Sequence, residues 1–190
     1  MEGANFIDER GFWVGRVDDI AQHFFDPSLA QGLLSYLKEE ECRNVVDLGC
    51  GLGEYATFLK EGGIQCACFD GNPNTPEITD RCCGVLDLSK YHGPMFHFDW
   101  VLSLEVGEHI PKEYESNFIN NLHNFSTKGV ILSWAVKGQG GDGHVNCQNN
   151  EYIKDIFEKK GYSNDVDAEI ELRRVSQISW FKNTIMVFKK

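Results

Sequence analysis

Glycines and one aspartate near residue 50 could hold a ligand against the backbone. Val45–Leu48 is an apolar run with β-branched residues, which indicates a buried strand. Gly49, Gly51 and Gly53 follow at alternate positions, where glycine permits a sharp turn or a close ligand. The spacing is not that of a dinucleotide fingerprint. The carboxylate of Asp47, just inside the turn, suits a ligand that carries an ammonium or sulfonium charge.

A second acidic residue ends the next predicted strand. The run Ile64–Phe69 leads into Asp70, which is followed by Gly71-Asn72-Pro73. An acid at this place in nucleoside-binding α/β units accepts hydrogen bonds from both ribose hydroxyls. The alternative is a turn-forming aspartate, because Gly-Asn-Pro is itself a turn sequence. With the glycine turn upstream, we expect the ribose role.

Two histidines in later loops are candidate proton acceptors near neutral pH. His109 lies in the loop Glu105–Pro111, directly after the apolar run Phe98–Leu104. His144 lies in the glycine-rich loop 136–148, and long loops of this kind are often functional. The structural alternatives are a helix-start network around Glu108 and a flexible connector that carries His144.

Alternating strand and helix patterns would position these residues. Asp26 and Pro27 predict a helix start, followed by Leu33, Leu34 and Leu37 on one buried face. The remaining apolar patterns predict strands near 83–86, 98–104, 129–135 and 183–188, and helices over 54–60, 112–125, 151–161 and 168–176. This order predicts an open α/β sheet with its ligand site beyond the carboxyl ends of the strands.

The motifs together resemble class I S-adenosylmethionine-dependent methyltransferases. The stretch Val45–Gly53 resembles their first motif, Asp99–Pro111 their fourth, and the loop 137–148 a loop of small methyltransferases of the type 11/12 kind. The resemblance implies a Rossmann-like, doubly wound, seven-stranded sheet with the last strand antiparallel. It also implies one domain over residues 1–190, with an N-terminal helical lid over 1–41 and a core over 42–190.

The resemblance also implies the site residues and S-adenosyl-L-methionine as the cofactor. Asp87 would lie near the adenine, although it could instead cap the segment 88–91. His144 and His109 are the expected catalytic residues, and Phe12, Trp13 and His23 are candidate pocket residues. The expected cofactor-binding residues are Asp47, Gly49, Cys50, Gly51, Gly53, Tyr55, Asp70, Gly71, Asn72, Asp87, Leu88, Leu104 and Glu105.

Composition limits the class of partner. The chain has 190 residues, 42% hydrophobic, and a net charge of −11, which argues against nucleic acid as a main partner. The sequence begins polar and acidic, and no apolar run approaches a membrane helix, so we expect a cytoplasmic protein without membrane contact. The seven cysteines are expected to be reduced, and their spacings do not favour zinc. No metal is expected, and the oligomeric state cannot be read from the sequence.

These observations predict methyl transfer to an oxygen or nitrogen atom of a small-molecule acceptor. Three alternatives stay open. An NAD-dependent dehydrogenase would share the strand, glycine turn and ribose acid. A non-catalytic S-adenosylmethionine-binding module would keep Gly49, Gly51, Gly53 and Asp70 without turnover. A protein methyltransferase is the third alternative.

Overall fold

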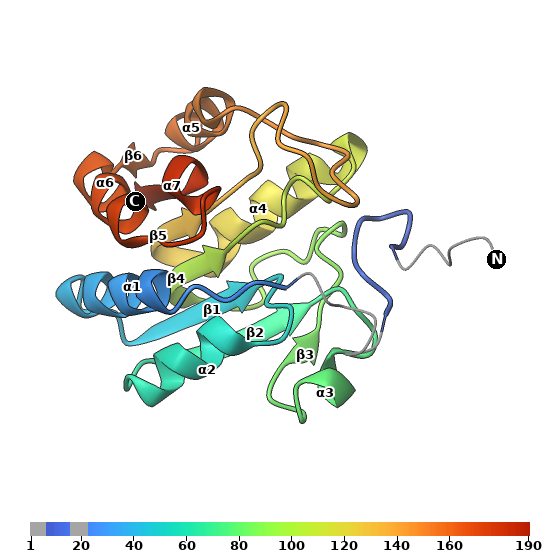
Figure 1. The fold of residues 1–190 in the computed structure, drawn as a ribbon, viewed down its shortest axis with the longest axis horizontal. Coiled ribbons are helices and arrows are strands. Elements are labelled where there is room, and N and C mark those ends of the chain that lie inside the picture. The colour runs from blue at the N-terminus through green and yellow to red at the C-terminus, as the bar shows by residue number, and fades with distance from the viewer. Residues whose placement is uncertain (1–6, 16–22) are drawn as a thin grey trace.

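Parallel strands alternate with helices along the chain in the computed structural model, which describes residues 7–15 and 23–190. In this described part, seven strands form one sheet of order β3-β2-β1-β4-β5-β7-β6 (Figure 1). Its strands are β1 (Asn44–Leu48), β2 (Gln65–Asp70), β3 (Gly84–Val85), β4 (Phe98–Ser103), β5 (Ser126–Leu132), β6 (Ser163–Asn164) and β7 (Met186–Lys189). The helices are α1 (Pro27–Glu39), α2 (Glu54–Glu61), α3 (Thr75–Ile78), α4 (Glu115–Phe125), α5 (Asn150–Lys159), α6 (Val166–Val175) and α7 (Phe181–Thr184), with a 3₁₀ turn η2 (Lys112–Tyr114).

Both faces of the sheet are covered, because successive side chains of a strand point to opposite faces. Val46 and Val101 pack in one apolar cluster with residues of α4 and α5. Their neighbours Val45 and Trp100 pack in a second cluster with α1, α2 and α6. The central strands are therefore buried on both sides, which explains their continuous apolar sequences.

The last strand is antiparallel and pairs with β5 through Leu132 and Met186, as predicted. The predicted start of this strand at residue 183 is wrong. Asn183 and Thr184 instead belong to the short helix α7. The Thr184 hydroxyl, which has one proton to donate, lies 3.0 Å from the Trp180 carbonyl oxygen and 3.2 Å from Glu105 Oε1. Tertiary contacts thus hold a β-branched residue in a helical turn.

The predicted helix start at Asp26 is confirmed and also ties two distant segments together. Asp26 Oδ1 accepts hydrogen bonds from the backbone N–H groups of Ser28 and Leu29, at 3.1 and 3.0 Å. Its Oδ2 accepts from the backbone of Gln177 and Ile178, at 2.6 and 2.9 Å. The residue is 1% exposed, so water cannot replace the carboxylate. Asp26 therefore caps α1 and fixes the chain that follows α6.

Replacing Asp26 with alanine is expected to lower the free energy of unfolding by about 2–4 kcal/mol. The estimate combines a lost N-cap with backbone donors left unpaired in a buried place. Urea unfolding of the two proteins measures it. Asp26→Asn keeps one acceptor oxygen and should lose less. A loss below about 1 kcal/mol for the alanine variant would show that the cap is not a major anchor.

None of the helices in residues 7–15 and 23–190 is long and apolar enough to cross a membrane.

Candidate active site

A cavity of about 370 Å³ opens at the carboxyl ends of β1, β2 and β4. This is where an open α/β sheet places its ligand. Twelve of the predicted catalytic and cofactor-binding residues line the cavity, as do the three candidate pocket residues. The lining residues are Asp47, Gly49, Cys50, Gly51, Tyr55, Asp70, Gly71, Leu88, Leu104, Glu105, His109 and His144, with Phe12, Trp13 and His23.

The glycine turn needs glycine for conformation and for space. Gly49 and Gly51 have φ values of 81° and 52°, in the left-handed region. A Cβ on Gly49 would lie 2.3 Å from Val106, and one on Gly51 would lie 2.2 Å from the His23 ring. The backbone N–H of Gly49 donates to the Phe69 carbonyl oxygen at 2.8 Å. The turn is thereby held against the end of β2.

Asp70 is oriented by the turn and faces the cavity. Its Oδ2 accepts a hydrogen bond from the backbone N–H of Gly51, and its Oδ1 accepts one from Asn72, both at 2.9 Å. Each carboxylate oxygen has a second lone pair. Asp70 can therefore accept two further hydrogen bonds from a ligand with adjacent hydroxyls, which is the geometry of a ribose.

Asp47 places a carboxyl group at the base of the cavity. It is 3% exposed, and burial raises its pKa well above the ordinary value for aspartate. A cationic ligand would favour the ionised form and offset this desolvation. The site is therefore better suited to an ammonium or sulfonium group than to an anion.

Three of the predicted cofactor-binding residues lie outside the cavity lining, and the structure gives them supporting contacts. Asp87 accepts a hydrogen bond from Arg10 at 2.6 Å and from the Ser89 hydroxyl at 2.6 Å, which corresponds to the local capping alternative. The Asn72 amide donates to the Gly15 carbonyl oxygen at 2.9 Å. A Cβ on Gly53 would lie 2.7 Å from Cys83 Sγ. The resemblance implied cofactor binding for these three residues, and this role stays a prediction.

Residues 7–15, the described part of the predicted lid before residue 23, form a turn and not a helix. Ile7 and Trp13 form an antiparallel bridge, and a Cβ on Gly11 would lie 1.9 Å from the carbonyl oxygen of His109. The helix α1 is part of the core, since Leu33 and Leu37 are fully buried. Phe12, next to Gly11, lines the cavity as expected. Residues 1–6 and 16–22 of the predicted lid lie outside the described part of the chain.

Glu105 joins the two loops that carry the histidines. Its φ of 53° is unusual for a residue with a side chain. The Ser133 hydroxyl accepts its backbone N–H at 2.8 Å, and its Oε2 accepts from the Gln139 amide at 3.0 Å. The Glu108 carbonyl oxygen accepts the backbone N–H groups of Val145 and Asn146, at 2.9 and 2.8 Å. These bonds dock the loop 136–148 on the loop that follows β4.

As a result, His109 and His144 meet beside the cavity. Their rings are 5.0 Å apart and nearly perpendicular. His144 Nδ1 lies 3.3 Å from the Gln139 carbonyl oxygen. In the tautomer that donates to this oxygen, Nε2 is the atom left to accept a proton. Both histidines line the same cavity as Asp70.

Glu108 completes this cluster and was expected to be only a helix-start residue. It is fully buried, and neither of its carboxylate oxygens has a hydrogen-bond partner among the described residues. Burial and the nearby Glu105 raise its pKa well above the ordinary value. Ligand atoms of Glu108, His109 and His144 lie within 4.8 Å of one another. Spacing along the sequence did not indicate this cluster, and the expectation that no metal is bound stays a prediction. The members come from two different loops.

The pKa of His109 predicts a pH dependence of stability. Burial, and then the nearby His144, lower this pKa from 6.5 to about 4. Between these pH values the unfolded chain binds more protons than the folded one, so the contribution of neutral His109 to stability falls as the pH drops. The free energy of unfolding of wild type should therefore approach that of His109→Asn as the pH falls towards 4. Urea unfolding of both proteins at a series of pH values measures the difference. A constant difference would contradict the shifted pKa.

Aromatic residues that the sequence did not single out for the cavity also line it. Trp180 and Phe24 pack edge to face at 5.5 Å, and Phe181 lies beside them. Phe24 is 58% exposed. The density of aromatic residues before α1 was a signal for Phe24, whereas nothing in the local sequence marked Trp180.

Comparisons with known proteins agree with this geometry. A scan of protein families finds none that matches the chain. A probable tocopherol O-methyltransferase, chloroplastic, of Oryza sativa subsp. japonica is 26% identical over an alignment 148 residues long, and the match covers 70% of this chain and 38% of that protein. The chain thus spans less than half the length of this relative.

Two solved structures illustrate the fold. Magnesium protoporphyrin IX methyltransferase (ChlM) from Synechocystis PCC 6803, with bound SAH (S-adenosylhomocysteine), superposes with a TM-score of 0.63 at 18% identity, covering 85% of this chain and 81% of that one. Small RNA methyltransferase HEN1 superposes with a TM-score of 0.65 at 16% identity, and the match covers 88% of this chain and 26% of that one. The resemblance to class I S-adenosylmethionine-dependent methyltransferases is confirmed at the level of the fold.

Proposed function

We propose that the chain is an S-adenosylmethionine-dependent methyltransferase that acts on an oxygen or nitrogen atom of a small-molecule acceptor. The observation that carries the proposal is one cavity lined by two chemically different sets of residues. Asp70 can accept hydrogen bonds from a ribose beside the glycine turn, and His109 and His144 line the same cavity. Asp47 supplies the carboxyl group that suits the cationic part of the cofactor.

The chemistry is a direct displacement. The cofactor supplies a methyl group on a sulfonium, which is a good leaving group, so no covalent enzyme intermediate is needed. The protein aligns the two reactants, which can supply several kcal/mol. The Nε2 atom of His144 accepts the proton of a hydroxyl or a protonated amine.

The comparisons support a small acceptor. The rice relative and the Synechocystis structure are named for tocopherol and for magnesium protoporphyrin IX. HEN1 is named for small RNA, so the fold alone does not separate the two classes. The net charge of −11 favours the small molecule, because RNA binding needs basic clusters. A cytoplasmic location, one domain over residues 1–190 and the absence of nucleic-acid partners stay predictions.

A methyl-transfer assay tests the proposal. Purified protein is incubated with methyl-labelled S-adenosylmethionine and a panel of small alcohols, phenols and amines, with a protein and an RNA as further arms. We expect label in a small acceptor and one S-adenosylhomocysteine formed per methyl. Label in the protein or the RNA alone would contradict the acceptor class. Cofactor binding without any transfer would instead favour the non-catalytic module.

A further inference from the structure

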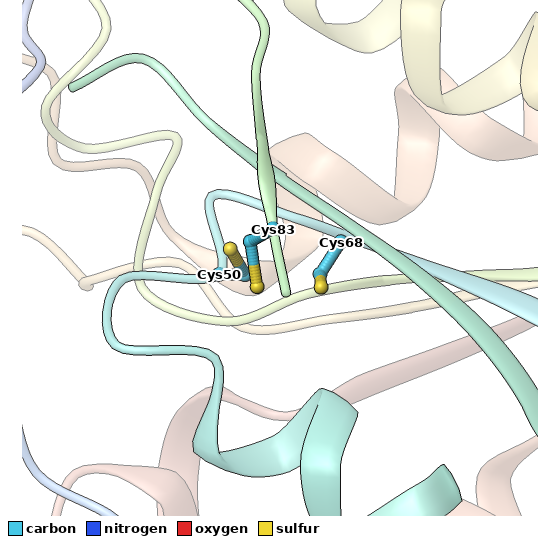
Figure 2. Close-up of side chains that lie close together, drawn as sticks. All are labelled: Cys50, Cys68 and Cys83. Atoms are coloured by element: carbon cyan, nitrogen blue, oxygen red, sulfur yellow. The ribbon is translucent and has the colours of Figure 1, made fainter. Parts of the chain in front are cut away.

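Three cysteines gather behind the glycine turn, as Figure 2 shows. The Sγ atoms of Cys50, Cys68 and Cys83 lie within 4.8 Å of one another. Cys50 belongs to the turn, Cys68 to β2, and Cys83 to the segment before β3. They meet because β1, β2 and β3 are adjacent in the sheet. Cys50 also lines the cavity, whereas Cys68 and Cys83 have no role in the methyl transfer proposed above.

The cluster is buried and lies beside one cationic side chain. Cys68 and Cys83 are 3% and 5% exposed, and Cys50 is partly buried. The ammonium group of Lys60 lies 3.8 Å from Cys68 Sγ. A neighbouring cation stabilises the thiolate, which is the form in which sulfur binds a metal.

We propose that Cys50, Cys68 and Cys83 bind one thiophilic metal ion through three sulfur atoms. Soft thiolate ligands select Zn²⁺ or Cu⁺ over hard cations such as Mg²⁺. On binding, each thiol that is still protonated loses its proton to solvent, and three metal–sulfur bonds form without any change of oxidation state. Zn²⁺ would keep a fourth position for water, whereas Cu⁺ needs no further ligand.

The bound ion would hold the glycine turn against β2 and the segment before β3. Cys50 lies between Gly49 and Gly51, and the Gly51 N–H donates to Asp70. The three sulfur atoms therefore join the turn, the middle of β2 and the start of β3 at one point. Because the unfolded chain does not hold these segments together, binding should stabilise the folded state.

The alternative is that the three thiols only pack as small apolar side chains, together with Ala56 and Cys66. The two accounts differ in one measurable respect. Packing alone predicts no tight, stoichiometric binding of a soft ion. A metal site predicts one ion per chain and dependence on each of the three residues but not on the other cysteines.

The experiment is a competition titration of the full, reduced and metal-free chain with Zn²⁺ and, separately, with Cu⁺ under anaerobic conditions. A chromophoric chelator reports free metal. We expect one ion per chain for at least one of the two metals, and an increase in the midpoint of thermal unfolding. Cys83→Ser and Cys50→Ser should each weaken that binding by more than about 100-fold, since loss of even an outer-shell partner costs roughly 10–100-fold.

Matched controls are Cys42→Ser and Cys147→Ser, which remove thiols outside the cluster and should leave the affinity within about twofold of wild type. Circular dichroism checks the fold of every variant. If the buried Cys83 variant does not fold, the Cys50 variant in the partly exposed turn decides the question. Absence of stoichiometric binding of either metal, or binding that survives Cys50→Ser, overturns the proposal. Neither outcome depends on whether the protein transfers methyl groups.

Discussion

Replacing Asp70 with alanine is expected to weaken the binding of S-adenosylhomocysteine by about 1.5–3 kcal/mol, which is roughly 10- to 150-fold. The loss arises because the carboxylate would no longer accept hydrogen bonds from the two ribose hydroxyls. Isothermal titration calorimetry of wild type and variant measures it. Asp70 also accepts the backbone N–H groups of Gly51 and Asn72, so the variant must be shown to stay folded.

Two further variants distinguish a role of Asp70 in ligand binding from a role in the structure of the turn. Asp70→Asn keeps one acceptor oxygen for the backbone and should still bind less tightly, because an amide cannot accept as many hydrogen bonds. Glu77→Ala removes an exposed acidic residue in α3, outside the cavity, and should leave the affinity unchanged. An unaltered affinity of a folded Asp70→Ala protein would make Asp70 a turn residue only.

Replacing His144 with alanine is expected to lower the turnover number by about 10²–10⁴-fold, the usual range for loss of a general base. The affinity for S-adenosylhomocysteine should change little, because His144 is not among the residues expected to bind the cofactor. The measurement is initial rate at saturating cofactor, once an acceptor has been found. A loss of fold would instead make the loop 136–148 structural.

The same assay distinguishes a base from a metal ligand, since Glu108, His109 and His144 could hold a divalent cation. A base role predicts that a chelator leaves the wild-type rate unchanged, and that the rate of His144→Ala rises with pH as hydroxide or buffer takes the proton. Loss of the wild-type rate with the chelator and its return with Mg²⁺ or Mn²⁺ would show a cation in this cluster.

Features whose conformation depends on one short stretch of the chain could be predicted from the sequence. The stretch Val45–Gly53 contains most of β1, the glycine turn and the N-cap of α2, and the left-handed φ values of its glycines are a local property. Asp26 could be identified as a helix cap because its first partners are two and three residues away. Asp70 could be placed because it ends the strand next to the turn.

The remaining features depend on which segments meet in space. Asp87 pairs with Arg10 from the N-terminal segment, a contact that no local pattern indicates. The sequence predicted only a helix-start role for Glu108. The loop 136–148, which docks on Glu108, is distant in the chain, so the local sequence did not indicate this contact. Cys50, Cys68 and Cys83 are spaced without a metal-binding pattern along the chain, and only the order of β1, β2 and β3 brings their sulfur atoms together.

The central claim is that this cavity binds a sulfonium-type nucleoside cofactor and not a dinucleotide. Calorimetric titration of the wild-type chain with S-adenosylhomocysteine and, in parallel, with NAD tests it directly. The account predicts saturable binding of S-adenosylhomocysteine with one site per chain, lost or weakened in Asp70→Ala, and no binding of NAD. Saturable binding of NAD with none of S-adenosylhomocysteine would contradict it.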